Sequence, residues 1–243
     1  MLKLVAVAEW GGRAAGVDRV AEAVSRMLAG VPVPQGLERR DWFDLHDRTP
    51  VASEHEALVD WVERHRERGS DGAVQPLAGF TLDVAQGVDG PAADESLPFV
   101  TIAVMAGVVV GGPRMPANTV KVSASAGWMD AATEQDRVEL VRVLAEAWEP
   151  ARAATYDRDV TRGLPRLPPR TPWPGYATYF SSELVPDLRL PAEYRVTALG
   201  GGALAVLDPP WEASRALEGV TTFLAESSFD PIPEREPEGA DRA

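Results

Sequence analysis

The side chains best suited to acid–base or metal chemistry are the three histidines, His46, His55 and His65. His55 and His65 are ten residues apart on a predicted helix, which places them about 80° apart around it and ~15 Å apart along it. They cannot share a metal ion at that separation, and neither has the partner four residues away of a helical zinc site. His46 lies between Asp44 and Asp47 in a predicted loop, where it could pair with a carboxylate or be solvated; we favour solvation.

Nucleophilic and phosphate-binding sites have little support in the chain. It has no cysteine, which excludes disulfides, thiolate metal sites and a cysteine nucleophile. Ser181-Ser182 has no base nearby in the sequence, and Gly200-Gly201-Gly202 precedes a predicted strand, which favours a hairpin turn over a phosphate cradle. We therefore expect no enzyme activity, no catalytic residue, no cofactor and no metal. Carboxylates are plentiful, so a small carboxylate-dependent enzyme stays an alternative.

The chain is strongly acidic, with a formal net charge of −13 over 243 residues. Such a surface repels nucleic acid and anionic lipid, because both are bound through Lys and Arg. It attracts a basic protein, and complementary charge can raise an association rate by about 10- to 1000-fold. Acidity that serves only solubility is the simpler alternative. Residues 230–243 hold five acids and two arginines, so −3 of the charge lies there and −10 in the rest.

One stripe of the predicted second helix is acidic, and its members are Glu56, Asp60, Glu63 and Glu67. Their spacing of +4, +3 and +4 places them within about 60° of arc. The stripe is either a solvated face, whose negative charge three neighbouring arginines partly neutralise, or a docking surface for a basic partner. We take these four acids, together with any exposed ring at Trp42 or Trp173, as the candidate partner-binding residues.

Residues 161–175 form a connector with five prolines and three arginines. Its Pro-Arg-Leu-Pro-Pro-Arg run resembles a polyproline-II ligand, but a stiff spacer is the interpretation that we favour. The connector leads into the aromatic segment Tyr176-Ala177-Thr178-Tyr179-Phe180. Since side chains alternate in a strand, Tyr176 and Phe180 share one face and Tyr179 lies on the other. We expect these rings to be core residues, with both faces of the strand covered.

Apolar spacing and end signals predict four helices: residues 17–30, a helix that follows Ser53 and ends at Gly69, one from Thr133 to Trp148, and one from Asp208-Pro209 to about residue 226. Strands are predicted at 2–8, 80–85, 98–105, 119–125, 176–182, 194–198 and 203–207, with 39–45 a strand or an ordered loop. Residues 86–97 are predicted to be a loop. The fold class is α+β, with one twisted, mostly antiparallel sheet covered by about four helices.

We expect residues 1–229 to form a single domain and residues 230–243 to be a disordered acidic tail. No apolar run approaches the ~20 residues of a membrane span, and residues 2–8 lack the design of a signal peptide. The expected location is therefore the cytoplasm.

Three groups of residues together resemble the immunity protein 52 family, bacterial proteins encoded beside polymorphic toxins. The first is Glu9-Trp10-Gly11-Gly12-Arg13, followed by a helix and Trp42. The second is Thr119-Val120-Lys121-Val122, then Trp148-Glu149-Pro150 and residues 153–157. The third is residues 175–180, Leu184, Leu188 and Pro191, and Gly201-Gly202 before Asp208. The resemblance extends to about residue 229. Here Tyr176 and Phe180 stand where the family has Trp and Leu, and Ala15 where it often has an acid.

The resemblance implies a protein that inhibits a toxin, often one with a nuclease domain, and it implies no catalytic residues. The preferred hypothesis is therefore a cytoplasmic immunity protein that occludes a cognate toxin, with a basic nuclease-like domain as its partner and no nucleic acid or membrane. A carboxylate-dependent enzyme and a scaffolding module of a secretion locus are the two alternatives.

Overall fold

The computed structural model describes residues 3–75, 77–86, 100–110 and 116–234. Its strands are β1 (Lys3–Trp10), β2 (Trp42–Asp44), β3 (Phe80–Gln86), β4 (Val100–Ala106), β5 (Asn118–Ala124), β6 (Arg152–Thr155), β7 (Ala177–Ser181), β8 (Tyr194–Leu199) and β9 (Gly202–Leu207). Its helices are α1 (Val17–Gly30), α2 (His55–Arg64), α3 (Ala126–Ala131), α4 (Glu134–Trp148), α5 (Arg158–Gly163) and α6 (Ala213–Glu226). None of the helices in these ranges has both the length and the apolar character that crossing a bilayer requires.

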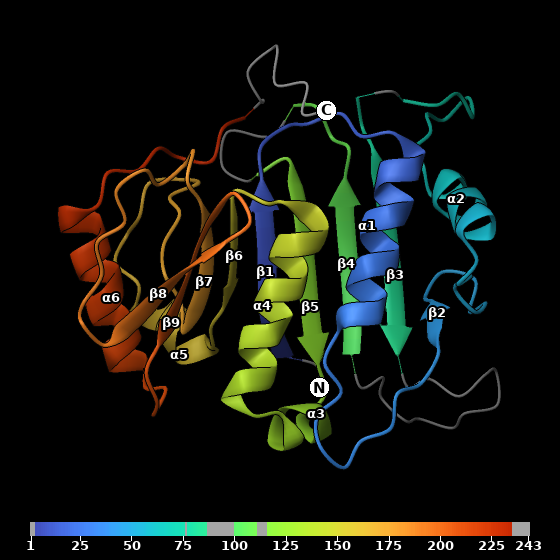
Figure 1. Ribbon diagram of the computed structural model, residues 1–243. Helices are drawn as coiled ribbons and strands as arrows, with labels where there is room; N and C mark the ends of the chain where they lie inside the picture. The colour runs from blue at the N-terminus through green and yellow to red at the C-terminus, as the bar shows by residue number, and fades with distance from the viewer. Residues whose placement is uncertain (1–2, 76, 87–99, 111–115, 235–243) are drawn as a thin grey trace.

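The strands form one sheet in the order β2-β3-β4-β5-β1-β6-β7-β9-β8, and every neighbouring pair is antiparallel (Figure 1). The predicted α+β class is confirmed. The sheet is larger than expected, with nine strands, and the described residues form six helices rather than about four.

The first strand lies in the middle of this sheet. On one side of β1, Trp10 is opposite Asn118 of β5, and on the other side Glu9 is opposite Arg152 of β6. Strand β1 therefore joins two halves. We call β2, β3, β4, β5 and β1 the N-terminal half, and β6, β7, β9 and β8 the C-terminal half.

In the N-terminal half, helices cover one face of the sheet. Leu82, Ile102 and Val122 point to that face and belong to one core cluster with residues of α1 and α2. Figure 1 shows α1 lying in front of β3 and β4. The alternate residues point the other way, and Asp83 and Lys121 are exposed there. Burial therefore alternates along these strands, as expected when one face is solvated.

In the C-terminal half, helices cover both faces of β6 and β7, while the edge strand β8 is exposed at residues 195–198. Every residue of β6 is buried, and so is every residue of β7 before Ser181. Tyr179 belongs to the core cluster that includes α4, whereas Tyr176 packs with α5 and α6 on the opposite face. The predicted alternation along β7 is confirmed, and Tyr176, Tyr179 and Phe180 are core residues, exposed by 3%, 4% and 1%.

Several predicted boundaries were wrong. Strand β6 and helices α3 and α5 were not predicted. The second helix ends at Arg64 rather than Gly69, because the chain then turns to run beside β3, where the Thr81 N–H donates to the His65 carbonyl (3.2 Å). The last helix begins at Ala213 rather than after Asp208. The capping box between Thr133 and Asp136 is confirmed, while the one predicted at Ser53 is absent, because α2 is capped by Glu54 without a side-chain bond.

The segment from Asp230 to Glu234, which we assigned to the tail, packs against the domain. Ile232 is 1% exposed and its N–H donates to the carbonyl of Arg170. Glu234 forms an ion pair with Arg170, with 3.1 Å between Oε1 and Nη2. The packed part of the chain therefore extends to Glu234. Residues 235–243 and the predicted loop at 87–97 lie outside the described residues.

Candidate functional site

A large groove, about 1290 Å³ in volume, lies at the end of the sheet where β1 finishes, near the upper ends of β1 and α4 in Figure 1. Trp10, Tyr179 and Leu199 line it from the strands. The last turn of α4, the loop after β7, the turn between β8 and β9, and residues 230–234 complete its walls. We call this the motif groove.

Side chains of the first motif support one wall of the groove. Trp10 stacks on Trp148 at the end of α4, with 5.6 Å between ring centroids. Arg13 donates from Nη2 to the Trp148 carbonyl (2.9 Å), and its guanidinium lies 5.9 Å from the Trp10 ring centre. A cation at the C-terminus of a helix also interacts favourably with the negative end of the helix dipole. The motif therefore fixes the end of α4 against β1.

The two glycines of the motif allow other segments to approach closely. A Cβ atom on Gly11 would lie 2.7 Å from the Pro233 carbonyl oxygen, and one on Gly12 would lie 1.8 Å from that of Val109. Neither distance is tolerable for a larger residue. The Gly12 N–H donates to the Glu234 carbonyl (3.1 Å), so the end of β1 holds the last described segment in place.

All three groups of residues that carry the family resemblance meet at this groove. Trp10, Gly11 and Arg13 come from the first group, Glu149 and Pro150 from the second, and Tyr179 and Gly201 from the third. These residues lie far apart in the sequence. The order of the strands, with β1 between β5 and β6, brings them together.

The groove carries more acidic than basic side chains. Its lining contains Glu146, Glu149, Glu183, Asp230 and Glu234 against Arg13 and Arg170. Two of the acids are paired, Glu149 with Arg19 and Glu234 with Arg170. Two others, Glu146 and Asp230, are exposed and make no ion pair with any described residue. The groove therefore has an excess of negative charge that neighbouring residues do not neutralise.

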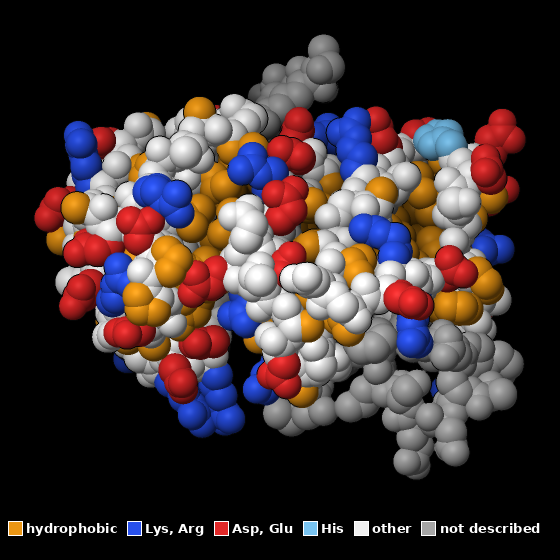
Figure 2. Space-filling view, turned by 60° about the horizontal axis from the view of Figure 1, so that its bottom comes forward, with side chains coloured by type: hydrophobic (Ala, Val, Ile, Leu, Met, Phe, Trp, Pro, Cys, Tyr) orange, Lys and Arg blue, Asp and Glu red, His pale blue; other side chains and the backbone are white. Residues whose placement is uncertain are grey.

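The predicted acidic stripe is only partly a stripe. Glu56 and Asp60 are exposed on α2. Glu63 is paired with Arg66 (3.0 Å), and Glu67 lies beyond the end of the helix, beside β3. Figure 2 shows acidic and basic side chains interspersed on one face of the molecule. Net charge alone therefore does not mark a binding site.

Neither candidate tryptophan presents a free ring. The Trp42 Nε1–H donates to the Leu28 carbonyl (3.2 Å), and its ring packs against the core. Trp173 lies 4.7 Å from the Tyr156 ring and 4.3 Å from the Arg152 guanidinium. Both side chains are half-buried. They lie in different halves of the sheet, so the structure does not bring the six candidate residues into one site.

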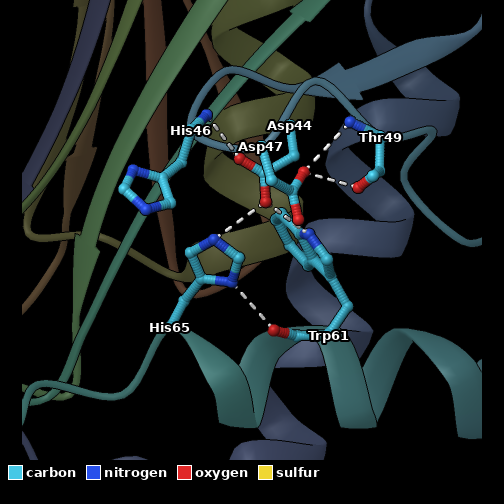
Figure 3. A network of polar contacts seen from close by, with 6 residues as sticks. All are labelled: Asp44, His46, Asp47, Thr49, Trp61 and His65. Carbon is cyan, nitrogen blue, oxygen red and sulfur yellow. Dashed lines mark hydrogen bonds and ion pairs between the residues drawn. The ribbon is translucent and has the colours of Figure 1, made fainter.

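A polar network that the sequence did not reveal joins β2 to the end of α2 (Figure 3). The Asp44 carboxylate is 1% exposed. It accepts hydrogen bonds from the Trp61 Nε1–H (2.8 Å) and the His46 backbone N–H (2.7 Å). His65 Nε2 lies 2.8 Å from the same carboxylate. A buried charge is stable only when it is paired in this way.

The two ring nitrogens of His65 both face acceptors. Nε2 faces the Asp44 carboxylate, and Nδ1 lies 2.9 Å from the carbonyl oxygen of Trp61. Neither acceptor can donate a proton, so both contacts are satisfied when both nitrogens are protonated, as in the imidazolium. In this arrangement neither nitrogen is left to remove a proton from a substrate or to bind a metal ion. The pair resembles a catalytic dyad, but its geometry fits a structural ion pair.

A shallow depression of about 660 Å³ lies beside this network, lined by residues that include His65, Asp47 and Asp83. Asp83 is exposed on the sheet surface but loses part of its hydration beside this network, and this partial desolvation, followed by repulsion from Asp44, raises its pKa above the usual value of 3.8. Hydrogen bonds from Thr49 lower the pKa of Asp47. Two carboxyl groups near one depression thus have pKa values shifted in opposite directions.

The other predicted chemical groups have ordinary structural roles. His46 and His55 are exposed. Ser182 Oγ donates to the Gly201 carbonyl (2.8 Å), and Gly200, with φ +52°, forms the predicted hairpin turn between β8 and β9. Within the described ranges, no group of three or more His, Asp or Glu side chains is arranged to hold a metal ion.

Comparison with known proteins gives little further information. No family model matches the chain, and no curated protein matches it. A solved structure of the Pseudomonas aeruginosa T6SS protein PA0821 is similar with a TM-score of 0.48 and 9% sequence identity, over 90% of this chain and 73% of that one. This similarity is too distant to carry an argument about function, and the resemblance to immunity protein 52 stays a prediction.

Proposed function

We propose that this protein is an immunity protein that acts in the cytoplasm and neutralises a cognate toxin by covering its active surface. One observation carries the proposal: the residues that resemble immunity protein 52 come from distant parts of the chain and line one groove. Gly11 and Gly12 are needed there for close packing, so the motif residues form a shared structure. A groove with unneutralised acids complements a basic surface of a partner protein.

The net charge supports a nuclease as the partner. A nuclease presents Lys and Arg to the phosphates of its substrate. A protein with a net charge of −13 complements that surface and is steered toward it, so association is fast and depends on salt. Blocking the surface requires tight binding but no chemical reaction.

The direct test is to identify a toxin gene beside the gene for this protein and to co-express the two products. We expect the toxin to stop growth when expressed alone and growth to recover when this protein is present. A complex should form in vitro, and its association rate should fall as salt is raised. A toxin from an unrelated locus is the specificity control. The proposal is rejected if the two purified proteins do not bind and toxicity persists.

A carboxylate-dependent enzyme is the second candidate, favoured by Asp83 alone. Its pKa is raised, as in a general acid, and it lines a depression that contains Asp47. His65 cannot assist as a base while both its nitrogens are bonded. This candidate predicts hydrolysis of an ester or phosphodiester substrate that Asp83→Asn abolishes without unfolding the protein. Equal activity in both proteins would exclude Asp83 from that role.

A further inference from the structure

We infer that the motif groove binds an extended, basic segment of a partner protein. The identification of that partner as a toxin rests on the proposed function, but the chemistry of the groove does not. Three features of the groove support this occupant: its size, its charge, and the donors and acceptors on its walls.

The groove is larger than a pocket for a small molecule. Its volume of about 1290 Å³ exceeds the roughly 300–1,000 Å³ of typical small-molecule sites. Its walls come from a helix end, a hairpin turn and two loops, and it is partly open to solvent. A length of polypeptide chain fits such a shape better than a compact ligand.

The charge of the groove favours cations. The five acids in its lining outnumber the two arginines, and Glu146 and Asp230 have no ionic partner among the described residues. Helix α4 also ends at the groove, with Glu149, Pro150 and Ala151 in the lining. The carbonyl end of a helix carries partial negative charge, which stabilises nearby cations. Lys or Arg side chains of an occupant would pair with Glu146 and Asp230.

Arg170 supplies the second kind of contact. Its Nη2 is bonded to Glu234, but its Nε and Nη1 are buried without any hydrogen-bond partner. Buried donors without partners are rare, because each loses its bonds to water. Protein atoms cover both donors, but the side chain as a whole is 16% exposed and lines the groove. A turn of the guanidinium into the groove would let a backbone carbonyl of an occupant accept from them. A peptide provides both this carbonyl and the basic side chains.

The test uses the full chain and an acetylated, amidated peptide of alternating Gly and Lys, about twelve residues long. We expect binding at low salt, measured by fluorescence anisotropy of the labelled peptide, and no binding of the matching Gly-Glu peptide. The variant Glu146→Gln with Asp230→Asn should weaken binding about tenfold. Glu193→Gln with Glu218→Gln removes the same charge from exposed positions elsewhere and should change it less than about twofold.

The outcomes distinguish this inference from the proposed function. Equal weakening by the two double variants would show that the peptide responds only to net charge, and the inference would be wrong. Absence of binding by the unmodified protein would also overturn it. Thermal unfolding of each variant checks that a loss of binding is not a loss of fold. If the groove fails this test while the toxin is still neutralised, the immunity role stands and the partner binds elsewhere.

Discussion

The two halves of the sheet are stabilised in different ways. In the N-terminal half, one layer of helices covers one face, and Asp83 and Lys121 on the other face are exposed. In the C-terminal half, α4 lies on one face and α5 and α6 on the other. The N-terminal half therefore keeps a free surface, whereas β6 and β7 of the C-terminal half are buried on both faces and only the edge strand β8 is largely exposed.

Buried ion pairs stabilise the sheet at the two places where apolar packing is limited, its outer edge and the junction of the halves. The buried Asp44–His65 pair lies at the outer edge of the N-terminal half, where β2 has only three residues. At the junction of the halves, Glu9 pairs with the buried guanidinium of Arg152 (2.8 Å). The doubly covered half instead stacks aromatic rings, such as Phe180 on Phe223 at 5.4 Å. The motif groove opens at the junction of the halves, where Trp10 of β1 and Tyr179 of β7 both line it.

The largest contrast should appear on removing one side chain from each half. Phe180→Ala leaves a cavity in the doubly covered half, and we expect it to lower the free energy of unfolding by about 3–5 kcal/mol. Met105→Ala, on the free face of β4, should cost less than about 1 kcal/mol. Urea unfolding followed by circular dichroism measures both. Similar losses of unfolding free energy in the two variants would show that the face of β4 that carries Met105 is covered in solution.

The junction is tested by Glu9→Gln. This change leaves the Arg152 guanidinium, 2% exposed, without its carboxylate, and we expect it to cost about 2–4 kcal/mol. Combining it with Arg152→Met removes the unpaired charge. The double variant should therefore be more stable than Glu9→Gln alone, as measured by the same unfolding experiment. A single variant as stable as the original protein would show that the pair does not hold the halves together.

The outer edge is tested by Asp44→Asn. An amide has the shape of the carboxylate, but it offers one oxygen. Its NH2 group would face either the donors of Trp61 and His65 or the His46 backbone N–H, so one of these contacts would pair donor with donor. We expect a loss of about 1–3 kcal/mol. Asp41→Asn, at an exposed position on the same segment, is the control and should change stability by less than about 0.5 kcal/mol. Equal effects would contradict a structural role for the network.

The smallest effect concerns Asp83 and depends on pH. Its folded pKa is raised, so the stability that this group contributes is present below its unfolded pKa and is lost as pH rises through the folded pKa. Asp83→Asn removes that loss. Because Asp83 is exposed, solvent screens its interactions, and we expect the variant to gain less than about 1 kcal/mol relative to the original protein between about pH 3 and pH 7. A difference that is constant with pH would exclude titration of Asp83 as its cause.

The same contrast explains which elements the sequence could predict. Strands β3, β4 and β5 alternate between apolar and polar residues because one face is solvated. Strand β6, buried on both faces, has four residues with no alternation, and two of them are alanine. Helix α6 was predicted to start too early, because Asp208 resembles an N-cap. In the structure Asp208 instead pairs with Arg195 (2.6 Å) on the neighbouring strand, a contact that local patterns cannot indicate.

The candidate site was harder to predict than the fold. The prediction of an acidic stripe assumed a helix that continued to Glu67. In the structure the helix ends at Arg64, and the residues that follow it contact β3. The Asp44–His65 pair depends on the approach of two segments that helical or strand periodicity does not encode. The motif residues of the groove were visible in the sequence as Gly and Trp positions. Their convergence depends on the strand order, which the sequence left open.

The central place of β1 has a consequence for synthesis of the protein. Both neighbours of β1 are made much later, since Lys3 pairs with Ala124 and Glu9 with Arg152. During translation, neither strand that pairs with β1 is available until about half of the chain has been synthesised. Distant pairings slow folding, and an unpaired apolar strand can associate with other chains. We therefore expect the nascent chain to depend on chaperones until β6 has left the ribosome.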